Sequence, residues 1–207
     1  MLQVHHLNNS RSQRILWLLE ELALPYEIVA YQRDTTTNLG PESLKKVHPL
    51  GKSPVLVDGK TVVIESGAII EYVVRRHGKG RLAPAESSPD WPLYLQLMHY
   101  AEGSAMLPVM LKLYTSRIGD AGAPLQPRIT SEIENHFGWL ESLLSGADWF
   151  VGNTFSAADI QLSFAIQAAK MLHGLDKFPN LARFVERGKA RPAYQKALER
   201  GGPSIFA

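Results

Sequence analysis

Every strand-forming pattern of this chain lies in its first third, and this limits the folds open to it. Residues 2–7 (LQVHHL) are typical of a short strand, and residues 26–31 (YEIVAY) are rich in β-branched and aromatic side chains. Beyond about residue 80, the apolar residues recur only at helical spacing. We therefore predict an α/β part of roughly 80 residues followed by an all-α part of roughly 120 residues.

The first two strands are separated by a helical pattern. One face of that helix is marked by four apolar residues: Ile15, Leu16, Leu19 and Leu22. The helix is expected over about 12–23, and Pro25 ends it. Ser10 or Ser12 is expected to cap it, because a side-chain oxygen can accept from the free N–H groups of the first turn. A strand–helix–strand order implies a parallel pair of strands.

Residues 55–64 (VLVDGKTVVI) consist of two apolar runs around Asp58-Gly59, a dipeptide suited to the positive φ angles of a tight turn. We predict an antiparallel hairpin there, in the same mixed sheet as the first two strands. A helix opens at Glu65-Ser66 and ends near 78–80 (GKG), and a short helix is expected around 42–48.

Residues 81–90 (RLAPAESSPD) are rich in Pro and Ser, which is typical of a linker. We therefore place an α/β domain at 1–80 and an all-helical domain at 91–207. A long helical pattern over 91–117 should be kinked by Pro108. Further helices are expected over about 125–144, near 179–189 and near 192–199. Another begins at Ser156, and its spacing from Asp159 predicts a capping box with a role in folding.

The composition excludes several classes of protein. The 207 residues are 45% hydrophobic and 20% charged, with a net charge of +2 and no run of like charges to favour a nucleic-acid partner. Because there is no Cys, disulfides, thiolate zinc sites, iron–sulfur clusters and a cysteine nucleophile are ruled out. No stretch approaches the roughly 18 apolar residues of a membrane helix, and the N-terminus lacks the pattern of a signal peptide. We expect a cytoplasmic protein with no membrane or nucleic-acid partner.

Most motif tests for chemistry fail. Gly51-Lys52-Ser53 resembles the end of a phosphate-binding loop, but Lys46 stands where that motif needs a glycine. His5 and His6 are adjacent on a strand, so their side chains point to opposite faces and make a poor metal pair. We expect no metal site.

Two local features remain. Pro54 belongs at a strand start or edge. A cis Ser53–Pro54 peptide would let Val55 offer its N–H and C=O to an added peptide strand, whereas a trans proline would merely start the strand. Glu65 and Ser66 stand at a helix start, where free N–H groups and the helix dipole attract an anion. Ordinary N-capping by Ser66 is the simpler alternative. Together, the two features fit a small peptide with a free carboxylate.

Three longer segments are specific when taken together and in order. They are NNSRSQRILWLLEELALPYEIV (8–29), GKSPVLVDGKTVVIESGAIIEYV (51–73) and VGNTFSAADIQLSF (151–164), and the segment HYAEGSAM (99–106) lies in the kinked helix. The chain thereby resembles the glutathione S-transferases over nearly its whole length, and HYAEGSAM resembles a bacterial and fungal subgroup. The resemblance implies a thioredoxin-like N-terminal domain, an all-helical C-terminal domain and a homodimer.

Carried over position by position, the resemblance also implies a glutathione-binding set in the first domain. Lys52 would face the glycine carboxylate of glutathione. Val55 would pair with the cysteinyl backbone, after Ser53 and a cis Pro54. Glu65 and Ser66 would hold the γ-glutamyl end.

The residue that activates the glutathione thiol stays open among four neighbours. Family members place a hydroxyl near the end of the first strand to donate to the thiolate, which is the nucleophile. The first tyrosine, Tyr26, lies on the second strand and there is no Cys, so the resemblance is to serine-using members. Asn9 stands at the family position, with Ser10 beside it and Arg11 and Ser12 following. Ser10 is our first candidate, but an amide or guanidinium can also donate, and both serines have helix capping as an alternative role.

Met106, Met110 and Tyr114 recur every four residues along the kinked helix. In the family this face lines the pocket for the second substrate, and flexible thioethers suit varied apolar ligands. A stripe buried in the core has the same spacing. Glu102 lies one turn before Met106 and, in a homodimer, would reach the partner's glutathione. A solvated surface glutamate is the simpler alternative.

The resemblance thus implies a cytoplasmic, detoxifying glutathione S-transferase that stabilises the glutathione thiolate for attack on a small electrophile. Glutathione would be a substrate, and no metal is needed. The alternatives are a glutathione-dependent disulfide reductase or peroxidase, an isomerase, or a non-catalytic glutathione-binding module. The sequence does not identify the electrophile, because its pocket depends on side-chain packing.

Overall fold

The chain forms two compact units in a computed structural model that describes residues 1–206. One unit comprises Met1–Leu82 and Lys189–Ile205, and the other comprises Ala83–Gly188 with Phe206. The first boundary falls inside the expected 81–90 linker. The second unit does not extend over all of the expected 91–207 domain, because Lys189–Ile205 belongs to the first unit.

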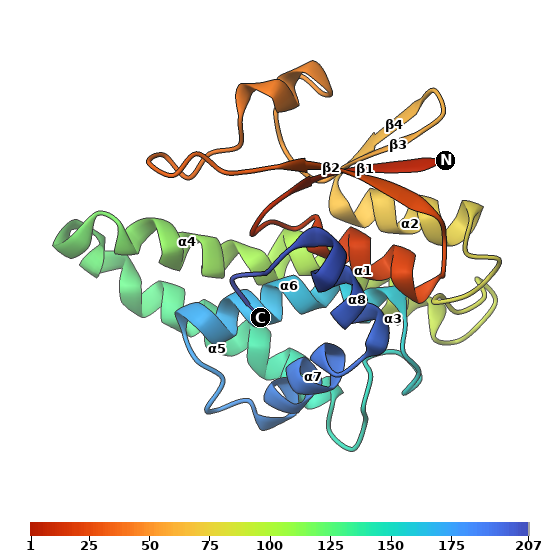
Figure 1. Ribbon diagram of the computed structural model, residues 1–207. Coiled ribbons are helices and arrows are strands. Elements are labelled where there is room, and N and C mark those ends of the chain that lie inside the picture. Colours follow the sequence, from red (N-terminus) through yellow and green to blue (C-terminus); the bar gives the residue numbers. More distant parts are fainter. Residues whose placement is uncertain (207) are drawn as a thin grey trace. The chain divides into compact units, whose positions relative to one another are not determined.

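Within the described residues, the first unit contains a four-stranded mixed sheet (Figure 1). Its strands are β1 (Leu2–Leu7), β2 (Tyr26–Tyr31), β3 (Val55–Asp58) and β4 (Thr61–Ile64), in the order β2-β1-β3-β4. The β1–β2 pair is parallel, and the β1–β3 and β3–β4 pairs are antiparallel. This arrangement confirms the predicted mixed sheet and the thioredoxin-like fold of the N-terminal part.

The hairpin between β3 and β4 turns one residue later than predicted. Asp58 pairs with Thr61, so the loop is Gly59-Lys60 and not Asp58-Gly59. Gly59 has a φ of +60°, as expected for a two-residue turn with glycine at its first central position.

Two helices of the first unit follow β1 and β4. They are α1 (Gln13–Glu21) and α2 (Ser66–Arg76), and a short 3₁₀ helix spans Glu42–Lys46. α1 buries a continuous run from Arg14 to Leu19. Ser12 directly precedes α1 but makes no side-chain cap. The predicted cap by Ser12 is therefore wrong, because its hydroxyl bonds to groups of β1.

The second unit is built of helices, as predicted. Its elements are α3 (Trp91–Tyr100), α4 (Met106–Ser116), a 3₁₀ segment (Gly119–Leu125), α5 (Gln126–Leu143), α6 (Ala157–Leu172) and α7 (Pro179–Lys189). α6 lies in the core of this unit, since most of its residues are buried. In residues 1–206, no helix combines the length and the apolar character needed to cross a membrane.

The predicted kink in the 91–117 pattern takes the form of a π-helical segment. Ala101–Ala105 separates α3 from α4, and Pro108 follows it within one turn. Pro108 has no N–H for the carbonyl of Ser104, four residues earlier, so a regular helix cannot run through this position. The interruption consequently lies before the proline and not at it.

The predicted capping box at the start of α6 is confirmed. Asp159 Oδ2 accepts from the backbone N–H of Ser156 at 2.8 Å and from its hydroxyl at 2.9 Å, and Oδ1 accepts from the backbone N–H of Phe150 at 3.1 Å. Asp159 is fully buried, and burial raises the pKa of its carboxyl to about 6. The box joins the loop before α6 to the helix.

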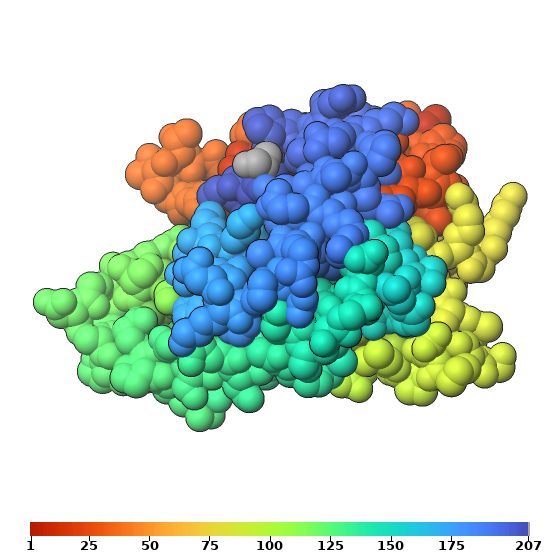
Figure 2. All heavy atoms as spheres, turned by 90° about the horizontal axis from the view of Figure 1, so that it is seen from below, coloured from red at the N-terminus to blue at the C-terminus, as the bar shows by residue number. Residues whose placement is uncertain are grey.

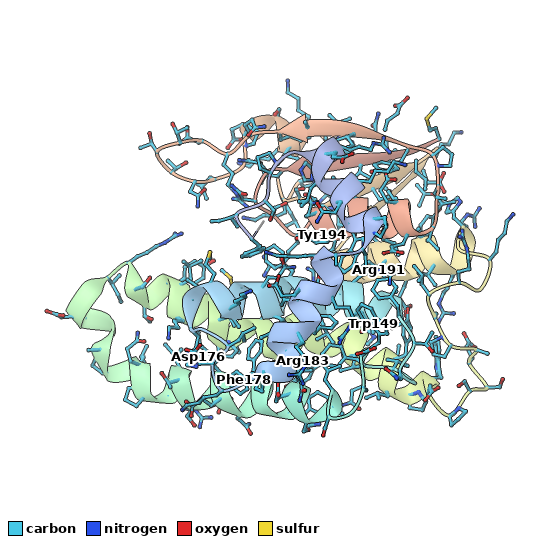
Figure 3. The ribbon with its side chains drawn as sticks, turned by 60° about the horizontal axis from the view of Figure 1, so that its bottom comes forward. Trp149, Asp176, Phe178, Arg183, Arg191 and Tyr194 are labelled. Carbon is cyan, nitrogen blue, oxygen red and sulfur yellow. The ribbon has the colours of Figure 1, made fainter. Side chains whose placement is uncertain are left out.

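The last helix, α8 (Pro192–Gly201), packs against α1 within the first unit (Figure 1). The Tyr194 ring meets the Trp17 ring edge-on, with the centroids 5.1 Å apart. Arg191 donates two hydrogen bonds, of 2.5 and 2.9 Å, to the Glu21 carboxylate. Tyr194 on α8 and Arg191 just before it are labelled in Figure 3. In Figure 2, dark-blue atoms of this segment lie beside red atoms near the N-terminus. These contacts explain why Lys189–Ile205 joins the first unit.

The end of α8 approaches α1 so closely that only glycine fits at position 201. A Cβ there would overlap Leu16 Cδ1, and it would lie 3.2 Å from Gln13 Oε1 and 3.3 Å from His6 Nε2. Leu16 is itself fully buried, so its side chain has little room to move. Gly201 therefore sets the distance between α8 and the end of β1.

We expect Gly201→Ala to lower the free energy of unfolding by about 1–3 kcal/mol, because the added methyl group overpacks this contact. Gly103→Ala is the matched control, because a Cβ at that position meets nothing within 4 Å. There alanine should be neutral or favourable by up to about 1 kcal/mol. Urea unfolding followed by circular dichroism measures both variants, and equal stabilities would contradict the close approach.

Candidate functional site

The loop after β1 carries two serines whose side chains point into the unit. Ser10 is 7% exposed, Ser12 is fully buried, and their Oγ atoms lie 2.7 Å apart. Ser12 Oγ in turn lies 2.8 Å from His6 Nδ1. Burial lowers the pKa of His6, and the hydrogen bond with the Gly201 carbonyl acts in the opposite direction. Ser10 is thus the outer end of a hydrogen-bonded chain that leads to a neutral imidazole.

Asn9 is exposed, but its backbone and side chain are both held. Its φ is 51°, its side-chain Oδ1 accepts from the backbone N–H of Ile205 at 2.8 Å, and its carbonyl accepts from Arg33 Nη2 at 3.1 Å. Oδ1 can only accept and is already engaged, so the Asn9 side chain can offer a ligand the donors of its amide NH₂ group.

Two arginines lie near this loop. Burial lowers the pKa of Arg33, and the charge of Arg11 lowers it further, so the two guanidinium groups are close to each other. Positive charge favours a thiolate or carboxylate placed nearby. Sequence reasoning named Arg11 but missed Arg33, which follows β2 and reaches the loop only through the fold.

The Ser53–Pro54 peptide bond is cis, as the family resemblance implied. Ser53 Oγ donates to the His5 carbonyl at 2.8 Å and accepts from the Leu7 N–H at 3.1 Å. These bonds attach the segment before β3 to the end of β1.

Val55 lies inside the sheet and not at an edge. It pairs with His5 of β1 on one side and with Ile64 of β4 on the other. This pairing contradicts the expectation that Val55 offers its N–H and C=O outward, because a strand can be added only at an unpaired edge. Ser53 precedes the strand, and within residues 1–206 its backbone N–H and C=O have no hydrogen-bond partner. Ser53 therefore offers backbone groups next to the cis Pro54 that Val55 does not.

Ser66 begins α2 beside a buried arginine. Its Oγ accepts from Arg14 Nη2 at 2.9 Å, and the two residues are 3% and 2% exposed. A guanidinium can only donate, so the hydroxyl proton of Ser66 is not used on Arg14 and can be directed to a ligand. Arg14 also adds positive charge next to a helix N-terminus, which already favours an anion. Sequence reasoning missed Arg14, although a cation on a buried apolar helix face is a signal in itself.

Glu65 has an unusual backbone conformation at the N-cap of α2. Its φ is 64° and its ψ is 120°, a region that favours glycine. Such a residue costs about 1–3 kcal/mol, and examples cluster at functional sites. The side chains of Glu65 and Lys52 are both exposed, and neither forms an ion pair within the described part of the chain.

The backbone N–H of Leu7 joins the parts of the candidate site. It lies 3.3 Å from Ser12 Oγ and 3.1 Å from Ser53 Oγ, so both serines bind at the end of β1. Arg14 then connects the first turn of α1 to the first residue of α2. The structure therefore brings together four of the serines singled out above: Ser10, Ser12, Ser53 and Ser66. Among residues 1–206, no cluster of His, Asp and Glu side chains is placed to hold a metal ion.

The candidates on α4 belong to the helical unit, and they do not share one exposed face. Met106 is only 4% exposed, Met110 is intermediate, and Tyr114 is 54% exposed. Burial favours the core alternative for Met106. The exposed apolar stripe of α4 and the turn after it consists of Leu107, Leu111, Tyr114 and Ile118. Glu102 is half-buried in the π-helical segment.

Comparisons with family models agree with this geometry. A model described as glutathione S-transferase, N-terminal domain, matches residues 2–75, and one described as glutathione S-transferase, C-terminal domain, matches residues 120–200. Glutathione S-transferase 3 of Schizosaccharomyces pombe is 33% identical over 97% of this chain and 88% of its own length.

Solved structures match both units. A glutathione S-transferase from Actinobacillus pleuropneumoniae has a TM-score of 0.91 and 35% identity, covering 99% of this chain and 94% of that one. A sphingomonad glutathione S-transferase complexed with glutathione has a TM-score of 0.79 and 25% identity, covering 98% of this chain and 100% of that one.

We expect Glu65→Gly to raise the free energy of unfolding by about 1 kcal/mol, because glycine adopts this backbone conformation without strain. If Glu65 is retained for a ligand, the same change weakens binding. The matched control is Lys79→Gly, which replaces another non-glycine residue of positive φ, 52°, away from the site. Thermal unfolding measures stability, and titration with glutathione measures binding. A loss of stability in Glu65→Gly alone would contradict the strain argument.

Proposed function

Since this chain belongs to the glutathione S-transferase family, and is therefore a transferase, we propose that it activates glutathione for conjugation to a small electrophile. The observation that carries the proposal is a convergence at one end of the sheet. The serine hydroxyls after β1, the unpaired backbone groups of Ser53 and the N-terminus of α2 meet there. Each supplies a contact that a thiol-bearing peptide needs.

The γ-glutamyl end of glutathione would bind at the start of α2. Its carboxylate would accept from the Ser66 hydroxyl and from the free N–H groups of the first turn, with the charge of Arg14 nearby. The exposed Glu65 carboxylate would accept from the ammonium group. The sphingomonad relative, whose structure contains glutathione, supports this class of ligand.

The rest of the peptide would lie along the segment before β3. Its cysteinyl backbone would pair with the N–H and C=O of Ser53, next to the cis Pro54, while Val55 fixes the segment in the sheet. Lys52 would reach the glycine carboxylate.

Ser10 would donate to the glutathione thiolate. The Asn9 amide is the second candidate, although its oxygen holds Ile205. Ser12 is fully buried behind Ser10 and is better placed to act through it. Arg11, with Arg33 close by, would contribute positive charge that favours the thiolate.

The second substrate would bind on the apolar side chains of α4. Tyr114 and the partly exposed Met110 remain in this proposed surface, and Met106 would support it from the core. We place the enzyme in the cytoplasm and in detoxification as part of the same proposal. The electrophile is defined only as small and apolar.

The test begins with calorimetric titration of glutathione. We expect micromolar-to-millimolar affinity, which Ser66→Ala should weaken by about 1–3 kcal/mol, as for a lost hydrogen bond to a charged group. Ser142→Ala is the control, because within residues 1–206 this exposed hydroxyl bonds only the Trp139 carbonyl of its own helix, at 2.7 Å. Thermal unfolding of Ser66→Ala separates lost binding from lost stability.

Turnover assays then distinguish a transferase from the alternative enzymes and from a binding module. Conjugation of an aryl halide is expected. Reduction of a glutathione-capped disulfide or of a peroxide, or isomerisation, without conjugation would favour the alternative enzymes. Binding without any turnover would indicate a binding module. Absence of binding would overturn the proposal.

We also propose that the enzyme is a homodimer, as the family resemblance implies, with Glu102 reaching the partner's glutathione. Light scattering should give about twice the chain mass of 23.0 kDa, and Glu102→Ala should weaken glutathione binding without changing that mass. A monomer at micromolar concentration would contradict both statements.

A further inference from the structure

Two buried side chains, Ser12 and His6, connect Ser10, the candidate activating serine, to the end of α8. Ser10 Oγ lies 2.7 Å from Ser12 Oγ, Ser12 Oγ lies 2.8 Å from His6 Nδ1, and His6 Nε2 lies 3.0 Å from the Gly201 carbonyl. His6 and Ser12 are 3% and 0% exposed, so water does not replace these partners. These hydrogen bonds run without interruption from Ser10 in the loop after β1 to the last residue of α8.

The direction of each hydrogen bond follows from counting donors. A carbonyl only accepts, so His6 Nε2 carries a proton, and in the neutral ring Nδ1 must accept. Ser12 therefore donates to His6, because Nδ1 at 2.8 Å is closer than its other acceptor, the Leu7 carbonyl at 3.2 Å. Since the single proton of Ser12 is used, Ser10 must donate to Ser12. Burial lowers the pKa of His6, which keeps the ring neutral in the free protein.

This direction conflicts with the role expected of Ser10. With its proton on Ser12, Ser10 presents only a lone pair outward and cannot donate to a thiolate. For Ser10 to donate outward, Ser12 must donate to Ser10, and His6 Nδ1 must then donate to Ser12. Because Nε2 still faces the Gly201 carbonyl, both ring nitrogens would carry protons, and His6 would be an imidazolium.

We propose that His6 takes up the thiol proton of glutathione through Ser10 and Ser12. The S–H bond breaks as its proton moves to Ser10 Oγ, the proton of Ser10 moves to Ser12, and the proton of Ser12 moves to His6 Nδ1. The sulfur keeps the electron pair. The product is a thiolate that accepts a hydrogen bond from Ser10, with one positive charge on His6, so the net charge does not change. This inference rests on the proposed function, because it requires a bound thiol.

Burial opposes a positive charge on His6, but its contact with the Gly201 carbonyl favours one. The Gly201 carbonyl belongs to the last residue of α8, and the C-terminal end of a helix stabilises a cation. The other charged side chains of α1 and α8 have these places: Glu20 and Glu21 pair with Arg191, Lys196 and Arg200, the Arg14 guanidinium donates to Ser66 Oγ, and Glu199 is exposed. His5, the neighbour on β1, bonds instead to the Tyr31 hydroxyl at 2.9 Å. His6 acts through the two serines and is a positioning residue, since it does not touch the sulfur.

The direct test is nitrogen NMR of the histidine rings in the wild-type protein near pH 7. Glutathione should convert His6 from neutral ring to imidazolium and release no proton to the buffer. S-methylglutathione is the matched ligand, because it has the same peptide groups but no thiol proton, and it should leave His6 neutral. The His5 signals should not change with either ligand.

Variants give a second, independent readout. His6→Gln keeps a donor for the Gly201 carbonyl but removes the group that titrates. We expect it to raise the apparent pKa of the bound thiol by about one unit, which is tenfold less thiolate, and to lower kcat more than it changes KM for glutathione. His5→Gln is the control and should change neither quantity. Thiolate absorbance against pH measures the shift.

The outcomes separate this inference from the proposed function. If glutathione does not bind, both the proposed function and the proton transfer to His6 are overturned. If glutathione binds as a thiolate while His6 stays neutral and about one proton per site enters the buffer, the proposed function stands and the proton transfer to His6 is overturned. A thiol pKa unchanged in His6→Gln also overturns it. The NMR measurement on the wild type holds even if the variant does not fold.

Discussion

Two adjacent carboxylates on α1 make the first unit depend on the last helix of the chain. The side chains of Glu20 and Glu21 are only 4% and 9% exposed, and a buried charge without a partner is strongly destabilising. Arg191 pairs with Glu21, and Lys196 and Arg200 pair with Glu20. Burial alone would raise the pKa of Glu20, but hydrogen bonds from its neighbours, Lys196 foremost, outweigh that effect and lower it. α8 is therefore an integral part of the α/β unit.

The same docking completes the loop after β1. The carbonyl of Gly201 fixes the ring of His6, and the backbone N–H of Ile205 holds the side chain of Asn9. These contacts join positions separated by more than 190 residues, so the loop is positioned from both ends of the chain. The hydroxyl of Ser10 has its geometry because α8 is in place.

A structural feature could be predicted from this sequence when the residues that determine it lie close together along the chain. The hairpin after Val55 and the capping box of Ser156 and Asp159 were predictable, since each depends on residues within about ten positions. Ser12 was expected to cap α1, but the fold brings His6 within reach of its hydroxyl. Val55 was expected at an open edge, but β1 and β4 both pair with it. Only the buried cation Arg14 carried a local signal that was overlooked.

The discontinuous first unit has a consequence for synthesis in the cell. Its two parts, Met1–Leu82 and Lys189–Ile205, are separated by Ala83–Gly188, which contains every helix of the helical unit. At about 5–20 residues per second, a ribosome delivers the second part roughly 5–20 s after the first. During that interval the two glutamates of α1 lack their cations, while the helical unit already has all its residues except Phe206. Although the N-terminal strands emerge first, the last helix of their unit emerges only after every helix of the other unit. The order of synthesis is therefore not the order in which the two units can assemble.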